Sequence, residues 1–260
     1  MSLLLERTSV VLVEPQNDIN IGVAVRAARN FGVPSMRLVR PRVADPEEIL
    51  VCAPRSEEYI EGIEIYDDLD SALADRVFVV GLTARSRSAR WTVLTPPQAA
   101  RALQAASQEG PVAVLFGRED SGLPNEVLDR CHGVVTIPTN PEYTSLNLGQ
   151  AVLLMMWEIF RLQSGADGPG EEVGVVAAGG AVPMAALERL FQHAEEALEA
   201  VEFFKTDTRE HILRSVRSVF MRAGLDDREL AIWHGIFREV PAFLRRKGLV
   251  QEEDQSSTKQ

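Results

Sequence analysis

The chain has 260 residues, of which 45% are hydrophobic and 25% charged, and its formal net charge is −11 at pH 7. This composition is typical of a globular protein, and the length allows one large domain or one domain with a smaller module. The acidic total argues against a nonspecific nucleic-acid-binding protein, since such domains are usually basic, although a local basic patch still allows RNA binding.

Targeting signals and cysteines narrow the class further. The apolar stretches fall short of the roughly 18 residues that a membrane span requires, and the start, MSLLLERTSV, lacks the pattern of a secretory signal. We therefore expect a cytoplasmic protein without a membrane segment. Cys52 and Cys131 match neither a metal-ligand nor a disulfide pattern, so we expect small core residues and no metal.

Apolar runs alternate with helical patterns along the first part of the chain. Strands are predicted at Thr8–Val13, Met36–Val39, within 64–74, and at Val77–Gly81, Val112–Phe116 and Val134–Ile137. Helices are predicted after the first strand up to Gly32, from Pro46, within 64–74, over Pro96–Gln108, from Pro124, and from Leu146 to about Arg161. This alternation predicts an α/β fold with a mostly parallel sheet. The chain carries neither a GxGxxG pattern after the first strand nor a GKS or GKT phosphate loop, which argues against dinucleotide-binding and P-loop enzymes.

Two of the predicted strands end in irregular polar loops. Val112–Phe116 runs into Gly117 and a charged turn, and Val134–Ile137 runs into a polar stretch that reaches Ser145. Ligands of open α/β sheets bind beyond the carboxyl ends of the strands, so the pair of loops predicts a binding site. Each loop alone also fits an ordinary turn, with Ser145 as a helix N-cap. Asn147 has low helix propensity and requires a hydrogen-bonding partner if it is buried.

The stretch LTARSRSARWTVLTP follows the strand at Val77–Gly81. It places Arg85, Arg87 and Arg90 close to Trp91. Basic residues interleaved with an aromatic residue are typical of an RNA-facing loop. A flexible solvated loop is the alternative, with equal weight.

A glycine-rich stretch, residues 164–183, separates the α/β region, residues 1–163, from the rest of the chain. Such a composition predicts a flexible linker. Residues 184–250 are predicted to form a small helical module. Its expected role is either packing in a dimer or contact with RNA. Its helices are predicted at Met184–Val201, at Thr208–Met221 and at Asp226–Val240, the last ending near Pro241. Residues 251–260 form a polar tail that we expect to be disordered.

Three motifs occur in an order that is typical of a known family. They are NIGVAVRAARNFG from Asn20, FGREDSGLP from Phe116 and IPTNPEYTSLNLGQA from Ile137. Together they resemble the SpoU (TrmH-like) class of SPOUT RNA ribose methyltransferases, over about residues 8–163. The later stretch HILRSVRSVFMRAG is similar to the C-terminal extension of the TrmJ group. The resemblance implies a deep C-terminal trefoil knot, with about residues 112–161 threaded to form the cofactor pocket.

The resemblance implies a reaction as well as a fold. Members of the class transfer a methyl group from S-adenosylmethionine to a ribose 2′-hydroxyl, without a metal. Likeness to the TrmJ group implies tRNA as the substrate, nucleotide 32 of the anticodon loop as the site, cytidine or uridine as the base, and a homodimer as the working unit. The alternatives are ribosomal RNA or another tRNA position, and a noncatalytic RNA-binding protein that kept the fold.

The family pattern also implies roles for individual residues. The residues implied to act in catalysis are Arg26, Ser145, Asn20, Glu119 and Asn147. Those implied to hold the cofactor are Leu82, Thr83, Ala84, Gly117, Ile137, Thr144, Ser145 and Leu146. We expect RNA contacts from Arg29, Arg85, Arg87, Arg90, Arg214, Arg217, Arg222 and Arg245. A solvated helix face is the alternative for Arg26 and Arg29, and it is the favoured interpretation for Arg29.

The family view makes Arg26 the general base. A guanidinium group keeps its proton in proteins, so we expect Arg26 instead to orient the substrate phosphate and to stabilise the developing alkoxide. Glu119 is a second candidate for handling the proton, or for holding Arg26. We also expect Arg26 of one chain to complete the site of its partner.

Overall fold

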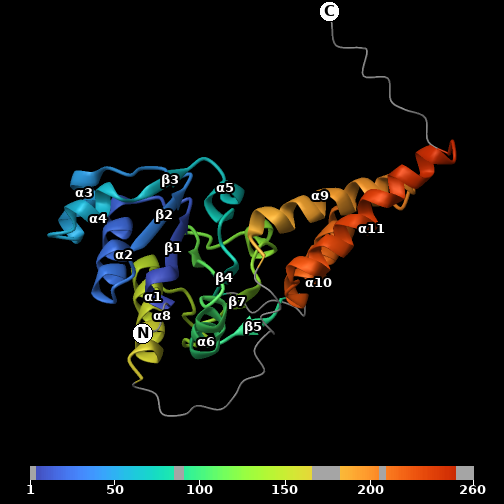
Figure 1. Ribbon diagram of the computed structural model, residues 1–260. Helices are drawn as coiled ribbons and strands as arrows, with labels where there is room; N and C mark the ends of the chain where they lie inside the picture. Colours follow the sequence, from blue (N-terminus) through green and yellow to red (C-terminus); the bar gives the residue numbers. More distant parts are fainter. Residues whose placement is uncertain (1–3, 85–90, 166–181, 205–208, 250–260) are drawn as a thin grey trace, which may run out of the picture.

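The computed structural model describes residues 4–84, 91–165, 182–204 and 209–249 (Figure 1). The expectations for Arg85, Arg87 and Arg90, for most of the linker and for the tail concern residues outside these ranges. The described residues form an α/β sheet domain and a C-terminal group of helices that extends away from it (Figure 1).

A parallel sheet of seven strands lies at the centre of the described residues, in the order β3-β2-β1-β6-β4-β7-β5. The strands are β1 (Thr8–Val13), β2 (Ser35–Val39), β3 (Glu64–Tyr66), β4 (Phe78–Leu82), β5 (Val93–Leu94), β6 (Val112–Phe116) and β7 (Gly133–Val135). Every neighbouring pair is parallel, which confirms the predicted sheet. Strands β2 and β3 lie on one side of β1 and the others on its opposite side, so the order reverses beside β1. Such a switch point is where α/β sheets bind ligands.

Each central strand contributes to two hydrophobic cores. In β1, Val10 and Leu12 belong to one core, and Val11 and Val13 to the other. Successive side chains of a strand point to opposite faces, so both faces of this sheet require a covering of helices. One core contains buried residues of α1 (Leu4–Arg7), α2 (Asp18–Asn30), α3 (Pro46–Cys52), α4 (Glu57–Glu61), α6 (Pro96–Ala106) and α8 (Leu148–Gln163). The other contains buried residues of α5 (Leu69–Leu73), α7 (Asn125–Leu128), α9 (Met184–Ala200), α10 (Arg209–Ala223) and α11 (Asp227–Arg246).

The boundary of α8 differs from the prediction for a local reason. The helix begins at Leu148 rather than Leu146, because Asn147 is its N-cap and accepts a hydrogen bond of 2.9 Å from the backbone N–H of Gly149. The interpretation of Ser145 as the N-cap was therefore wrong. Asn147 is exposed rather than buried, and its low helix propensity suits a cap better than a helix interior.

The last helix is longer than predicted. Proline usually ends or kinks a helix, at a cost of about 3 kcal/mol in the interior, so the sequence predicts an end near Pro241. In the structure, α11 continues through Pro241 to Arg246. The helix packs along α9, and tertiary packing supplies most of the stability of helices in proteins. The short β5 strand was not predicted, since two residues are too few to show a strand periodicity.

The C-terminal helices are joined to the sheet domain by contacts as well as by the chain. The N–H of Met184 donates to the carbonyl of Arg76 at 3.0 Å, and that of Ala185 to the carbonyl of Ala74 at 3.3 Å. Leu187 belongs to the same core as α5 and α7. From this attachment, α9 and α11 run side by side away from the sheet (Figure 1).

Strand β7 has a position that matters for the predicted knot. It lies between β4 and β5, so the chain after β6 enters the sheet instead of adding to its edge. The trefoil knot itself stays a prediction.

No helix among the described ranges is long and apolar enough to cross a membrane. Cys131 is buried and Cys52 half-buried, and neither forms a disulfide.

Candidate active site

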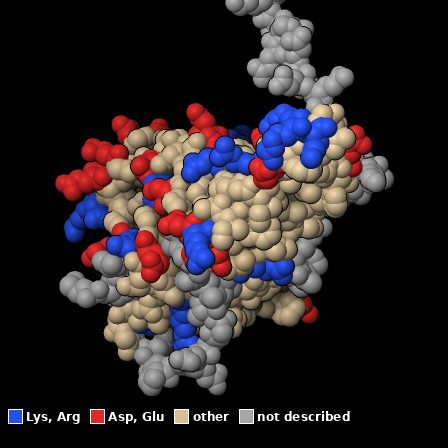
Figure 2. Space-filling view, turned by 45° about the vertical axis from the view of Figure 1, so that its right-hand side comes forward, with Lys and Arg blue, Asp and Glu red and all other residues tan. Residues whose placement is uncertain are grey.

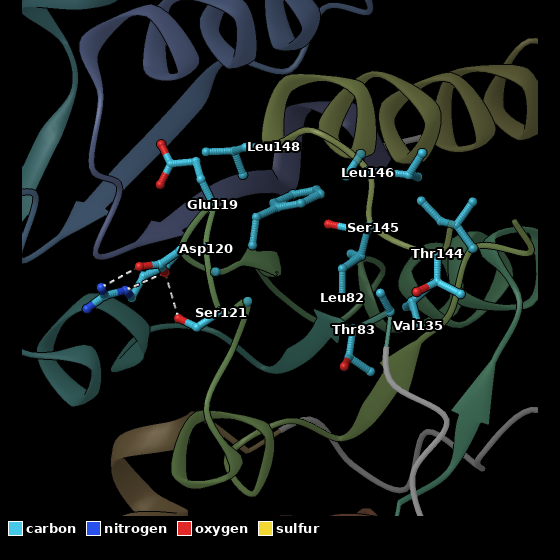
Figure 3. Close-up of a pocket in the computed structure, with 17 residues that line it drawn as sticks. Leu82, Thr83, Glu119, Asp120, Ser121, Val135, Thr144, Ser145, Leu146 and Leu148 are labelled. Atoms are coloured by element: carbon cyan, nitrogen blue, oxygen red, sulfur yellow. Dashed lines mark hydrogen bonds and ion pairs between the residues drawn. The ribbon is translucent and has the colours of Figure 1, made fainter. Parts of the chain in front are cut away.

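A cavity of about 290 Å³ opens at the carboxyl ends of β4, β6 and β7 (Figure 3). Its walls come from three stretches that are far apart in sequence: the end of β4 and the two polar loops. They consist of Leu82–Ala84, Phe116–Gly122, Val135, Ile137, Thr144–Leu146, Leu148 and Ala151. Every residue implied to hold the cofactor is among them, and their role in binding it stays a prediction. Sequence reasoning missed Phe116 and Val135, although Phe116 ends a predicted strand and Val135 lies within another, near the edge where ligands bind.

The loop after β6 is held by a very close backbone approach. A side-chain carbon added at Gly117 would lie 2.2 Å from the carbonyl carbon of Gly122, and Gly122 itself has φ of 69°. The N–H of Gly122 donates to the carbonyl of Arg118 at 2.9 Å, which closes the turn. Arg118 and Ser121 donate to the Asp120 carboxylate and hold the pKa of this group well below its usual range. The loop therefore has a defined shape at the cavity wall.

A chain of hydrogen bonds links the three motifs. Glu119 accepts from the backbone N–H of Gln16 at 3.1 Å and from Nδ2 of Asn20 at 3.0 Å. Oδ1 of Asn20 accepts from Nδ2 of Asn147 at 2.9 Å, and Oδ1 of Asn147 accepts from the N–H of Gly149. A carboxylate only accepts and a backbone N–H only donates, so the two ends of the chain determine both amide orientations.

Glu119 serves this chain rather than the centre of the cavity. Figure 3 shows its carboxylate turned away from Ser145, and it accepts hydrogen bonds from Gln16 and Asn20. The sequence suggested that Glu119 handles the proton or holds Arg26. Within the described residues of one protomer, Glu119 does not contact Arg26. Glu119 instead fixes the position of Asn20.

Ser145 lies on the wall of the cavity, from the loop before α8. Figure 3 shows its hydroxyl directed into the space between the loops. Within the described residues this hydroxyl has no hydrogen-bonding partner, and the residue is exposed. It is therefore accessible to a ligand in the cavity.

Arg26 lies apart from the cavity of its own protomer. It is exposed on α2 and is not one of the lining residues. It forms no hydrogen bond or ion pair with any residue of the described ranges. Ile19, Val23 and Arg26 follow each other at intervals of four and three, so they share one face of α2.

Exposed apolar side chains occur on α2 and on α8, which packs beside it. Ile19 is 54% exposed, and Trp157 is 44% exposed on the neighbouring helix. The surface also includes Leu153, Leu154 and Phe160. Phe31, the C-cap residue of α2, packs against Trp157 with ring centroids 5.9 Å apart, and α2 packs along α8. A patch of this kind on a protein surface is typical of an interface.

The basic residues predicted to contact RNA fall into different environments. Arg29 donates to Oγ of Ser56 at 2.8 Å and to the carbonyl of Arg55, so it ties α2 to the turn before α4. Arg222 is exposed and donates to the carbonyl of Ser218. Arg245 is exposed near the end of α11.

Arg214 and Arg217 are committed to carboxylates of the protein. Arg214 is 14% exposed and pairs with Asp129 at 2.5 Å, which joins α10 to the sheet domain. Arg217 is 19% exposed, pairs with Glu188, and lies 4.3 Å from the ring centroid of Phe191. Both guanidinium groups thus have structural contacts, and the RNA contacts expected from them stay predictions.

Comparison with known proteins agrees with this arrangement. The model of the SpoU rRNA Methylase family matches residues 7–157, and the model of the tRNA methyltransferase TrmJ C-terminal domain matches residues 185–252. The chain is 34% identical over 238 residues to the tRNA (cytidine/uridine-2′-O-)-methyltransferase TrmJ of Escherichia coli K12, which covers 91% of this chain and 96% of that protein. The corresponding protein of Klebsiella pneumoniae is also 34% identical, with 97% of its length covered.

A solved structure shows the same architecture. The crystal structure of TrmJ from Z. mobilis superposes with a TM-score of 0.77 at 29% identity, covering 89% of this chain and 98% of that one. The similarity therefore extends over both the sheet domain and the C-terminal helices. The family match, the sequence identity and the common architecture show that this chain belongs to the SpoU family of RNA methylases and carries the C-terminal domain of its TrmJ members.

Proposed function

We propose that the protein is an S-adenosylmethionine-dependent tRNA methyltransferase that modifies a ribose 2′-hydroxyl. The observation that carries the proposal is the hydrogen-bonded chain of Glu119, Asn20 and Asn147, which joins all three motifs beside one cavity. The names of the relatives specify a tRNA substrate with cytidine or uridine as the base. Nucleotide 32 follows from likeness to the TrmJ group and is part of the proposal. A tRNA substrate also favours a cytoplasmic location.

The cavity fits the chemical character of S-adenosylmethionine. Leu82, Ile137 and Leu146 provide apolar surface for an adenine ring, while the hydroxyls of Thr144 and Ser145 provide polar contacts. Backbone groups of the same loops supply further donors and acceptors. When bound, this cofactor supplies a methyl group on a sulfonium centre, which is activated for in-line displacement. No group of three or more metal-ligating side chains occurs in the described parts of the chain.

The protein has two tasks in such a reaction: to place the ribose hydroxyl and to assist the loss of its proton. Orientation alone supplies a large part of the rate of a two-substrate reaction. Ser145 lies on the cavity wall, where it can orient the ribose. Arg26 has a free guanidinium group within the described residues, which suits it to bind a substrate phosphate and to stabilise a developing alkoxide.

Arg26 does not line the cavity of its own protomer, so we assign it to the cavity of a second copy of the chain. It shares its face of α2 with Ile19, next to the apolar surface of α8 that includes Trp157. We therefore include a homodimer in the proposal, paired through this α2–α8 surface. In that arrangement, Arg26 of each chain serves the cavity of the other.

Mixed dimers test the shared site. Arg26→Ala and Ser145→Ala chains are each expected to be inactive alone. When the two are unfolded together, refolded and assayed, about half of the dimers combine both lesions in different chains, and each such dimer keeps one intact site. Recovery of activity supports sharing between chains, whereas no recovery places both residues in one site of the same chain.

The decisive assay is methyl transfer from labelled S-adenosylmethionine to unmodified tRNA, followed by mass mapping of the product. We expect a 2′-O-methyl group at nucleotide 32 with the natural chain and none with Arg26→Ala. Transfer to ribosomal RNA alone would keep the chemistry and change the substrate. Absence of cofactor binding at millimolar concentration would instead support a noncatalytic RNA-binding protein.

A further inference from the structure

The arginines of the C-terminal helices differ in whether a carboxylate of the protein neutralises them. Arg209, Arg214, Arg217 and Arg246 each form an ion pair with a glutamate or aspartate of the protein. Arg189 on α9 and Arg238 on α11 are exposed, and neither has a hydrogen bond or an ion pair within the described ranges. These two side chains are therefore free to bind an external anion.

Two histidines lie between these arginines, one on each helix. Nδ1 of His193 on α9 is 2.8 Å from Nδ1 of His234 on α11, and the ring centroids are 4.9 Å apart. One ring must donate this hydrogen bond and the other accept it, so the accepting ring is neutral in this arrangement. Both rings are half-buried and span the line of contact between the two helices.

The groups around His234 are mostly positive. Burial lowers the pKa of His234, and the positive charges of His193, Arg189 and Arg238 lower it further, while the backbone of Ala186 acts in the opposite direction. The largest charge effects on His234 thus come from α9 and from α11 itself, and all of them are positive. A gathering of like charges in an acidic protein is unfavourable unless an anion relieves the repulsion.

We propose that Arg189, His193, His234 and Arg238, hereafter the α9–α11 basic cluster, bind phosphate groups of the tRNA backbone. This inference rests on the proposed function and specifies where the C-terminal helices contact the substrate. Guanidinium groups match phosphate oxygens with two parallel hydrogen bonds. Phosphate oxygens also accept from both imidazole rings at once, which removes the need for one ring to stay neutral.

The position of the cluster favours an extended polyanion over a small phosphate. His234, Arg238 and Arg245 follow at intervals of four and seven, so they lie along one face of α11. Figure 2 shows basic side chains gathered near the end of α11, where the chain continues into the residues drawn in grey. A line of positive charge along a helix fits the regular spacing of phosphates in RNA.

Binding of phosphate at the cluster is coupled to protonation. An adjacent phosphate stabilises the imidazolium form of His234 and opposes the lowering of its pKa, so tRNA binding takes up a proton. The affinity for tRNA is therefore expected to increase as the pH falls from about 8 to about 6, by at most about tenfold per pH unit for one proton. His193→Gln and His234→Gln remove part of this dependence.

The test compares two double variants with equal loss of charge. Arg189→Gln with Arg238→Gln removes both free arginines of the cluster, and Arg209→Gln with Arg246→Gln removes two that are paired on the surface. The dissociation constant for unmodified tRNA is measured over a range of salt concentrations. Loss of each phosphate contact is expected to weaken binding roughly fivefold near about 0.15 M salt and to reduce the slope of log K against log salt by about one.

For the control pair we expect less than about a twofold change, because a paired arginine releases few counterions from RNA. Equal changes in affinity and slope for the two double variants would overturn the inference. Thermal unfolding of each variant verifies that the helices are intact. Methyl transfer by the natural chain separates the two proposals: if it methylates tRNA while the cluster variant keeps the same KM, only the cluster proposal fails.

Discussion

At the residue scale, the hydrogen bonds of Asn20 restrict which other side chains could take its place in the candidate site. Asn20 donates to the Glu119 carboxylate and accepts from Asn147, so it uses both ends of its amide. An aspartate has the same shape but lacks the donor. Asn17, three residues earlier, caps α2 with an oxygen that accepts from the N–H of Ile19, which an aspartate does equally well.

We predict opposite results for these two changes in one helix. Asn20→Asp sets a carboxylate against that of Glu119, where the present hydrogen bond is 3.0 Å long, and is expected to destabilise the fold by about 1–3 kcal/mol. It is also expected to reduce methyl transfer at least about tenfold. Asn17→Asp is the control and is expected to change neither. Urea unfolding and the transfer assay measure the two effects, and equal effects of both variants would contradict the role of Asn20.

His132 provides a pH prediction at the scale of one residue. It is buried against Phe78, and its Nδ1 accepts a hydrogen bond of 3.1 Å from the N–H of Val79. Burial lowers the pKa of this imidazole from 6.5 to about 4. The neutral form is favoured in the folded state, so its full contribution to stability is present above pH 6.5 and is lost as the pH falls towards about 4.

The loss is on the order of 3 kcal/mol when both states are fully protonated. We predict that His132→Gln, whose amide oxygen can also accept from Val79, loses less stability on acidification than the natural chain. Urea unfolding at neutral pH and at about pH 5 compares the two. An identical decrease for both proteins would show that other groups dominate the acid sensitivity.

At the scale of elements, the loop after β6 depends on the absence of a side chain. A Cβ at Gly117 would lie 2.2 Å from the carbonyl carbon of Gly122 and 2.3 Å from the nitrogen of Leu123, so backbone rather than a flexible side chain must move. Strand β6 itself is buried along its whole length and has no such constraint. An added side chain at Gly117 is therefore expected to displace the loop after β6.

We predict that Gly117→Ala weakens cofactor binding at least about tenfold, because the displaced loop forms part of the cavity wall. Gly235→Ala in α11 is the control, since nothing lies within 4 Å of an added carbon there. That change is expected to stabilise the helix by about 0.5–1 kcal/mol. Calorimetry with S-adenosylmethionine measures the first effect and thermal unfolding the second. Unchanged binding by Gly117→Ala would mean that the cofactor does not contact this loop.

At the scale of the whole molecule, the α2–α8 surface determines whether the proposed dimer forms. Trp157 lies within this surface and is 44% exposed, whereas Val51 on α3 lies outside it and is 73% exposed. Exposure alone therefore does not distinguish an interface residue from an isolated apolar side chain. The grouping of Trp157 with Leu153, Leu154 and Phe160 on one helix that packs against α2 favours an interface.

We predict that Trp157→Glu converts the dimer to monomers and abolishes methyl transfer, because a charge replaces a buried aromatic contact that is worth roughly 2 kcal/mol or more. Val51→Glu is the control and is expected to keep the dimer and the activity. Sedimentation equilibrium gives the association state of both. A dimeric Trp157→Glu protein would place the interface on another surface.

The sequence by itself determined the fold class and the place of the site. Periodic apolar runs and motif residues are local signals, so the parallel sheet, strand β6 and the loops around the cavity followed from them. Family resemblance added the reaction and the cofactor. The position of Asn147 as a cap was also encoded locally, but Ser145 two residues earlier is an equally good cap by residue type.

Only the tertiary structure decided which polar groups meet. Asn20 and Glu119 are 99 residues apart in the chain, and Asn20 and Asn147 are 127 apart. Arg214 resembles a free phosphate contact in sequence, yet packing of α10 places it against Asp129. The physical reason is that a charged or amide side chain takes whichever partner the packed elements bring within hydrogen-bonding distance, and no local pattern specifies that partner.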